Sequence, residues 1–327
     1  MAETKISWTD IVWNPVVGCT KVSAGCKNCY AATLHERRHE AWKAGRFPGA
    51  PPQYHAPFSQ VQLLPERLER PLHWRKPRRV FVNSVSDLFH ENVPDAYLDR
   101  IFAVMALSGE AGHVFQILTK RPARMASYLE GRDFCDPANE AFDRFVRPLS
   151  EDLFLAGEIT WPLENVWLGT SVEDQRAADE RIPHLLRTPA AVRFLSCEPL
   201  LGPVDLADYM PLVGDRCWDG GKCHHWCESE CWRRDFCAPL AQRDFFVDWI
   251  IAGGESGSGF RPMDPDWARS LRDQAREHHI PFFFKQSSGA RPEKGAMLDG
   301  REWREMPPWP GSEPGEKNRN AIEELKR

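Results

Sequence analysis

Three cysteines near the start of the sequence have the type and spacing of metal ligands. Cys19, Cys26 and Cys29 are separated by six and then by two residues. Gly18 and Gly25 bracket the first part of this loop, and glycine lets a loop fold so that several sulfur atoms converge on one centre. Thiolates bind soft metals and iron–sulfur clusters. Three thiolates would leave one iron of a four-iron cluster without a protein ligand, and such an iron can bind a substrate or a cofactor.

A structural zinc site is the main alternative for these three cysteines. Zinc normally takes four protein ligands in such a site, and His35 or His39 on the helix expected to follow could supply the fourth. Thiols that bind nothing are a further alternative, but closely spaced thiols are rarely idle in a reducing compartment.

Five more cysteines in one later segment predict a second metal site. They are Cys217, Cys223, Cys227, Cys231 and Cys237, with His224 and His225 among them. A small segment with little apolar content needs a metal to fold, so we expect residues 213–243 to form a Cys-rich metal-binding insertion. The same thiolates suit zinc or an auxiliary iron–sulfur cluster, and the sequence does not separate the two.

The composition is that of an ordinary folded protein of 327 residues, with 42% hydrophobic and 27% charged residues. The first residues lack a targeting pattern, and no apolar run is long enough to cross a membrane, so we expect a cytoplasmic protein without a membrane partner. In that compartment the 10 cysteines favour metal binding over disulfides. The net charge of -5 argues against a surface that wraps nucleic acid throughout, although residues 67–79 form a local basic segment.

Short apolar runs and amphipathic stretches alternate along the chain. The runs are rich in β-branched and aromatic residues and predict buried strands at 80–85, 113–118, 166–169, 192–195, 247–252 and 281–284. Helix-like stretches lie between several of them, at 95–107, 174–186 and 265–278. This alternation predicts an α/β fold with a parallel sheet.

Polar and ionisable residues follow every predicted strand. The carboxyl ends of the strands in a β/α barrel form one rim, where the chemistry of such folds takes place. Polar loops that cap the next helix are the alternative. We expect the following rim residues to contact a cofactor: Ser86, Asp87, Ser171, Glu173, Glu198, Gly253, Gly254, Glu255 and Ser256. Gly253 and Gly254 would allow close approach of a ligand, or simply form a tight turn, and Glu255 could accept hydrogen bonds from an amine or a ribose.

Three rim cations suit a phosphorylated substrate. Lys120, Arg121 and Lys285 could bind the phosphates of a nucleotide, because guanidinium groups bind phosphate in a bidentate manner and ammonium groups act as point charges. Alternatively, they pair with the carboxylates of neighbouring strand ends.

The segment ISWTDIVWNPVVGCTKVSAGCKNCYA resembles the signature of a phage and bacterial family of unassigned function that is known for a three-cysteine motif. Further stretches resemble the same family: VFVNSVSDLF, FQILTKRPARM, NVWLGTSVEDQRAADERIPHLL, RFLSCEPLLGPV, DWIIAGGESG and PFFFKQ. The resemblance covers most of the chain apart from the insertion and the extreme tail.

That family is in turn similar to radical S-adenosylmethionine enzymes. The sequence motifs at its strand ends resemble those of the spore photoproduct lyase branch, which repairs a DNA lesion. The resemblance implies a partial (β/α) barrel over residues 1–290, with the cluster loop after a first strand near residues 11–14. The insertion at 213–243 would lie within it, and residues 291–327 would form a C-terminal extension. Most such enzymes space their cysteines by three and two residues, whereas this chain has six and two.

The activity that the resemblance implies is radical chemistry. Cys19, Cys26 and Cys29 would hold a [4Fe–4S] cluster that cleaves S-adenosylmethionine to a 5′-deoxyadenosyl radical, with electrons from a donor such as flavodoxin or ferredoxin. The substrate would be a base of DNA or RNA, or a nucleotide, for repair or modification. Cys197 would donate a hydrogen atom to a substrate radical, although a lone cysteine is more often a small buried hydrophobe.

A function of a different class remains open at this point. Both cysteine groups could bind zinc in a non-catalytic nucleic-acid-binding protein, with the barrel as a scaffold.

Overall fold

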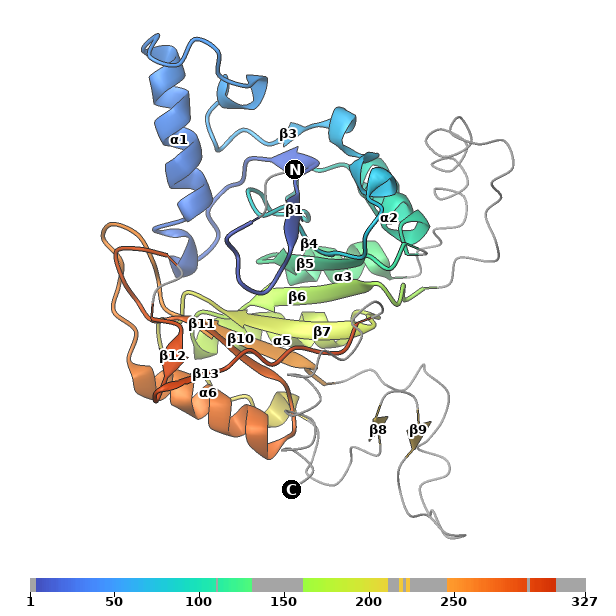
Figure 1. The fold of residues 1–327 in the computed structure, drawn as a ribbon, viewed down its shortest axis with the longest axis vertical. Helices are drawn as coiled ribbons and strands as arrows, with labels where there is room; N and C mark the ends of the chain where they lie inside the picture. The colour runs from blue at the N-terminus through green and yellow to red at the C-terminus, as the bar shows by residue number, and fades with distance from the viewer. Residues whose placement is uncertain are drawn as a thin grey trace.

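A curled, fully parallel sheet of seven strands forms the framework of the molecule (Figure 1). The computed structural model describes residues 4–109, 111–130, 161–210, 246–292 and 295–309, and the backbone of residues 218, 219, 222 and 223. In spatial order the strands are β1 (Ile11–Trp13), β4 (Arg79–Val82), β5 (Val114–Thr119), β6 (Val166–Ser171), β7 (Val192–Cys197), β10 (Trp249–Gly253) and β11 (Phe282–Gln286). Every neighbouring pair is parallel, and the sheet curls into a half-barrel, which confirms the predicted α/β class and a partial barrel.

Helices connect the strands and cover one face of the sheet. The three predicted helices are present as α2 (Asp95–Leu107), α5 (Gln175–Leu186) and α6 (Pro265–Glu277). Their starts follow from local chemistry, because Asp174 and Asp264 accept backbone N–H bonds at 2.9 Å as N-caps of α5 and α6. Two more helices are α1 (Tyr30–Lys43), which stands apart from the sheet at the upper left of Figure 1, and α3 (Pro122–Leu129).

Short elements complete the described chain. They are β2 (Val16–Val17), β3 (Gln62–Leu63), β8 (Trp218–Asp219), β9 (Lys222–Cys223), β12 (Met297–Leu298), β13 (Arg301–Glu302), and the 3-10 turns η1 (Ala24–Cys26), η2 (Pro52–Tyr54), η3 (Pro65–Arg67), η4 (Arg70–His73) and η7 (Ala207–Tyr209). None of the helices in the described segments is both long and apolar enough to span a membrane.

The two faces of the sheet are packed differently. One face joins the helices in the main core, to which β7 contributes Leu195 and Cys197. The opposite face carries a second, aromatic cluster that includes Trp167, Phe194 and Phe283. Because side chains alternate along a strand, the next residues on this aromatic face, toward the carboxyl ends, are small or polar, such as Ser171. This second face is therefore an aromatic floor that becomes polar where the strands end.

Residues beyond β11 cover the outer edge of the sheet. Phe284 N–H donates to Trp303 O at 2.9 Å, and Glu305 N–H donates to Phe282 O at 3.2 Å. The indole of Trp249 also donates to Glu305 O, at 2.9 Å. Part of the predicted C-terminal extension therefore belongs to the packing of the half-barrel.

The predicted insertion lies mostly outside the described residues. Its described part is the antiparallel pair β8 and β9, in which Trp218 lies opposite Cys223. Of the five cysteines in this segment, those outside the described residues are Cys217, Cys227, Cys231 and Cys237. The second metal site and its choice between zinc and an auxiliary cluster stay predictions.

Candidate functional site

Residues 18–29, called the cysteine loop from here on, cross the carboxyl-end side of the sheet. The loop begins beside the end of β4, where Gly18 N–H donates to Val85 O at 3.2 Å and Gly18 bridges to Ser86. Cys26 closes the turn η1, and Cys29 is the N-cap of α1. The thiols of Cys19, Cys26 and Cys29 are all partly exposed.

The described side chains do not form a closed ligand set. Among the residues that the structure describes, no group of three or more His, Cys, Asp or Glu side chains is gathered closely enough to hold a metal ion. The histidines that could complete a zinc site lie on α1 and are buried, and each bonds to a backbone carbonyl at 2.9 Å, His35 to Ala56 and His39 to Tyr54. The ligand role of the three cysteines stays a prediction.

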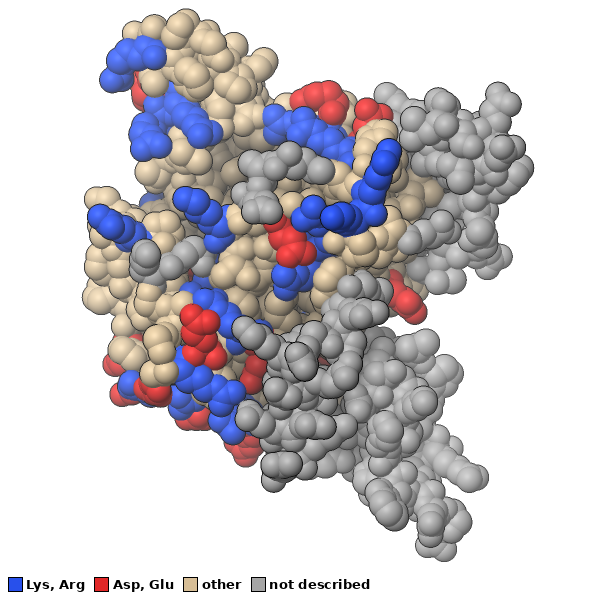
Figure 2. All heavy atoms as spheres, in the orientation of Figure 1, with Lys and Arg blue, Asp and Glu red and all other residues tan. Residues whose placement is uncertain are grey.

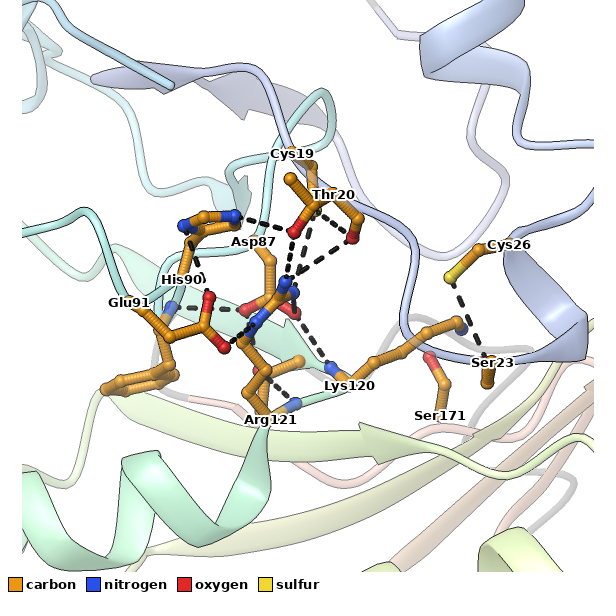
Figure 3. Close-up of polar contacts among 12 residues, drawn as sticks. Cys19, Thr20, Ser23, Cys26, Asp87, His90, Glu91, Lys120, Arg121 and Ser171 are labelled. Carbon is orange, nitrogen blue, oxygen red and sulfur yellow. Dashed lines mark hydrogen bonds and ion pairs between the residues drawn. The ribbon is translucent and has the colours of Figure 1, made fainter. Parts of the chain in front are cut away.

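Arg121 ties the start of the cysteine loop to the end of β5 (Figure 3). Its guanidinium lies 3.6 Å from Cys19 Sγ and donates to Thr20 Oγ1 at 2.9 Å. It also binds two carboxylates, Glu91 at 2.9 Å and Asp87 at 3.3 Å. The guanidinium is therefore held on both sides, with the Cys19 sulfur against a fixed cation.

The surroundings of Cys19 favour the neutral thiol. Burial and the Asp87 carboxylate raise the pKa of the Cys19 thiol to about 11, and the Arg121 guanidinium opposes them. His90 Nε2 lies 2.9 Å from Thr20 Oγ1, while His90 Nδ1 accepts the N–H of Asn92 at 3.1 Å. Burial and Arg121 lower the pKa of His90, so the imidazole is neutral and Nε2 carries its proton.

Glu173 holds the middle of the cysteine loop from the end of β6. Its side chain is 1% exposed and accepts hydrogen bonds from Ser23 Oγ and, at 2.6 Å, from Arg181 on α5. A Cβ atom at Gly25 would lie 2.4 Å from Glu173 Oε1, so only glycine allows this approach. Burial works to raise the pKa of Glu173, but Lys120, Arg181 and Ser23 outweigh it and hold the carboxyl ionised.

Glu255 holds the end of the cysteine loop from the end of β10. Its Oε2 accepts from Asn28 Nδ2 at 2.9 Å and from the backbone N–H of Arg261 at 2.8 Å. Arg261 pairs with the same carboxylate through Nε at 3.0 Å and reaches Ala24 O at 3.0 Å. Against the effect of burial, Arg261 and Asn28 lower the pKa of Glu255 to about 2.

Several other predicted cofactor contacts have partners within the protein. Ser86 Oγ donates to Val16 O at 2.9 Å. Besides Arg121, Asp87 accepts from Thr119 Oγ1 at 2.6 Å, from Phe89 N at 3.1 Å and from Lys120 N at 3.0 Å. The Asp87 carboxylate thus fixes the turns after β4 and β5.

The remaining predicted contacts lie around the ends of β6, β7, β10 and β11. Ser171 is the last residue of β6, and Gly253 ends β10, where a Cβ atom would lie 3.4 Å from Lys285 Cβ and 3.6 Å from Glu198 Cδ. Gly254 N–H donates to Gln286 O at 2.9 Å, and Ser256 bridges to Gly289.

The three predicted substrate cations differ in their surroundings. Arg121 is paired as described, and Lys285 forms an ion pair with Glu198 at 2.7 Å, as the pairing alternative anticipated. Within the described chain the Lys120 ammonium makes no ion pair, although it helps to lower the pKa of Glu173. Its side chain extends toward Ser23 and Cys26 in Figure 3. Of the three, Lys120 is the best placed to meet an anionic ligand.

Cys197 lies on the helix side of β7. Its side chain is 0% exposed within the main core, and burial raises the pKa of its thiol to about 12. A hydrogen-atom donor has to reach its substrate. The placement agrees with the alternative, a small buried hydrophobe.

The basic segment 67–79 is partly used inside the fold. Arg67 donates to Asn14 O at 3.3 Å, and Arg79 pairs with Asp10 at 2.6 Å. Figure 2 shows that Lys and Arg gather in several separate groups on the face in view, with Asp and Glu between them. The described residues of that face form no continuous basic track in this view.

Sequence reasoning missed the partners that hold the cysteine loop. They are Thr20, Ser23, Asn28, Arg181 and Arg261, together with His90 and Glu91 around Arg121. The available signal was the presence of hydrogen-bonding side chains between the cysteines, opposite the ionisable residues of the strand ends.

Fold and site together define a class: an α/β half-barrel whose strand ends carry a loop with three thiols. A family model described as "Protein of unknown function (DUF5131)" matches residues 3–307, and the chain belongs to this family. No curated protein and no solved structure matches the chain.

Proposed function

We propose that this protein is a radical S-adenosylmethionine enzyme in which Cys19, Cys26 and Cys29 hold a [4Fe–4S] cluster. The observation that carries the proposal is the place of the cysteine loop. It crosses the carboxyl ends of a parallel half-barrel, the edge where β/α folds carry their chemistry, and side chains from several strand ends bind it.

The chemistry of the donor set fits such a cluster. Three partly exposed thiols on one short loop can supply three iron ligands and leave the fourth iron open. The Arg121 guanidinium, 3.6 Å from Cys19 Sγ, favours the thiolate that a metal needs. Burial and Asp87 raise the pKa of the Cys19 thiol, so metal binding has to displace a proton from it, and the Arg121 guanidinium makes this loss of the proton easier.

When bound, a reduced cluster and S-adenosylmethionine supply a 5′-deoxyadenosyl radical that removes a hydrogen atom from a substrate. The chain itself would bind and orient the cofactor and the substrate, and would exclude water from them. The aromatic floor, with Trp167, Phe194 and Phe283 buried in it, would exclude water from the same face below the strand ends. Lys120 supplies a cation for a carboxylate or a phosphate next to the loop.

The proposed substrate is a base in DNA or RNA, or a free nucleotide, for repair or modification. The resemblance to the photoproduct lyase branch supports it, and so does the Lys120 ammonium, which makes no ion pair with the described residues and extends toward the loop. An electron donor such as flavodoxin or ferredoxin is the partner that the reduction requires.

Anaerobic reconstitution with iron and sulfide tests the proposal. We expect a brown protein that absorbs broadly near 400 nm and releases 5′-deoxyadenosine from S-adenosylmethionine after reduction. Iron, sulfide and zinc per chain are measured on the same sample. Cys26→Ala should lose the iron that the three-cysteine cluster contributes and all of the 5′-deoxyadenosine.

The matched control is Cys197→Ala, which removes a thiol from the core and should keep the iron content of the wild type. Zinc in place of iron, in a colourless protein that still binds nucleic acid, would instead support the non-catalytic zinc-binding alternative. Full turnover of the Cys26→Ala variant would show that the ligand assignment is wrong.

A further inference from the structure

Residues at the same position after four strands bind the cysteine loop or the residue that follows it. β4, β5, β6 and β10 end at Val82, Thr119, Ser171 and Gly253. Two residues beyond these ends lie Ser84, Arg121, Glu173 and Glu255. The Tyr30 hydroxyl donates to Ser84 O, and the other three contact the loop through their side chains.

Each of these three side chains is itself fixed by the barrel. Glu173 is held by Arg181 at 2.6 Å, and Arg121 by Asp87 at 3.3 Å. Glu255 accepts three bonds from Arg261, through the backbone N–H at 2.8 Å, Nε at 3.0 Å and Nη2 at 2.5 Å. A charged group that is buried and already paired costs little further entropy when it binds a loop.

The bound positions flank the cysteines in the sequence. Thr20 follows Cys19, Ser23 and Asn28 lie on either side of Cys26, and Asn28 precedes Cys29. Close packing of Gly25 on Glu173 adds a contact that does not depend on hydrogen bonding. Every stretch between the thiols therefore has an anchor on a different strand end.

We infer that Arg121, Glu173 and Glu255 are positioning residues that shape the cysteine loop for its ligand, and this inference rests on the proposed function. They act through Thr20, Ser23 and Asn28 rather than by contact with S-adenosylmethionine. The oxygens of both carboxylates are already bound to protein donors, and the two residues are almost fully buried, with Glu173 1% and Glu255 5% exposed.

Thiol reactivity in the metal-free, reduced protein tests the inference without the cluster. Four variants weaken the contacts between the loop and the strand ends, from the loop side by Ser23→Ala and Asn28→Ala and from the barrel side by Glu173→Gln and Glu255→Gln. We expect iodoacetamide to alkylate Cys26 and Cys29 about fivefold faster, which corresponds to about 1 kcal/mol for one hydrogen bond that restrains the loop. Peptide mass spectrometry follows each cysteine.

Asp10→Asn is the matched control, because Asp10 also pairs with an arginine, Arg79 at 2.6 Å, but lies before β1 at the opposite end of the sheet. It should leave the alkylation rates unchanged. If a glutamate variant fails to fold, Ser23→Ala and Asn28→Ala still test the inference, since they do not alter the half-barrel. Rates within about twofold of the wild type in all folded variants would overturn the inference.

A second measurement separates this inference from the proposed function. After reconstitution, the electron paramagnetic resonance spectrum of the reduced cluster should change in Glu173→Gln and stay that of the wild type in Asp10→Asn. Faster alkylation in a protein that takes up no iron would uphold the positioning role and defeat the radical-enzyme proposal. Unchanged alkylation in a protein that makes 5′-deoxyadenosine would do the reverse.

Discussion

The Glu255 carboxylate shows how one side chain can couple the site to the stability of the fold. It is buried, it binds Asn28 of the cysteine loop, and Arg261 pairs with it. A carboxylate held in this way stays ionised far below the pH at which glutamate normally takes up a proton. Protonation of Glu255 would weaken the anchor of the loop and the pairing of Arg261 together.

Glu255 should therefore make stability depend on pH in acid. Its pKa is about 2 in the folded protein against 4.5 ordinarily, so its contribution is complete above about pH 5 and is lost as the pH falls toward 2. Glu255→Gln should lower the free energy of unfolding by roughly 2 kcal/mol near neutral pH, and the difference from the wild type should shrink below about pH 5. Urea unfolding of both proteins at a series of pH values measures this difference in the free energy of unfolding. A constant difference down to about pH 3 would contradict the assignment.

At the scale of single residues, the sequence predicts which strand ends carry ionisable groups but not what those groups bind. Glu173 and Glu255 lie at the predicted rim, yet their partners are Ser23 and Asn28, more than a hundred residues earlier in the chain. Hydrogen-bond partners depend on tertiary contacts that leave no periodic pattern. Cys197 is a similar case, because only the alternation of β7 in three dimensions directs its thiol into the core.

At the scale of elements, the contact between β6 and β7 depends on a residue without a side chain. Gly169 of β6 lies against the ring of Phe194 of β7, where a Cβ atom would come within 2.5 Å of the ring carbons. The ring is fully buried in the aromatic floor, so it has little room to move.

Gly169→Ala should overpack this contact and lower the free energy of unfolding by about 1–3 kcal/mol. Gly49→Ala is the control, because a Cβ atom there meets nothing within 4 Å, and it should change stability little. Denaturant unfolding of both variants makes the comparison. Equal stability of the two would mean that the Phe194 ring is free to move aside.

Periodicity predicts the elements well because buried parallel strands and amphipathic helices have strong local patterns. All six strands predicted from apolar runs are present within a few residues, and helix 95–107 has the predicted bounds as α2. β6 and β7 each extend two residues further than predicted, because Ser171 and Cys197 still pair with neighbouring strands. The last residues of these strands include polar ones, which cannot be told from loop residues in the sequence, so the predicted strands end too early. α3 was not predicted, since its eight residues are too few for a clear helical period.

At the scale of the whole molecule, the half-barrel has an open side that the chain covers with its own later residues. Residues 303–305 bond to β11 and to the indole of Trp249, and Trp303 is 6% exposed. Such coverage protects the unpaired edge of an outer strand.

Truncation tests whether residues 301–309 stabilise the half-barrel. A chain that ends at Gly300 should be less stable than a chain that ends at Trp309 by about 3 kcal/mol or more, because it exposes the β11 edge and loses the buried Trp303. Thermal unfolding and light scattering compare the two chains. If the two melt at the same temperature, the segment 301–309 contributes nothing to the half-barrel.

The anchors of the cysteine loop also set an order of events in biosynthesis. The loop emerges from the ribosome early, but the Arg261 that binds Ala24 is synthesised 237 residues later. Until β10 has joined the sheet, the loop lacks the contacts that Glu255 and Arg261 make with Asn28 and Ala24. The fully anchored loop therefore exists only after Arg261 has been made and β10 has joined the sheet, so that maturation of the site follows folding of the half-barrel and cannot guide it.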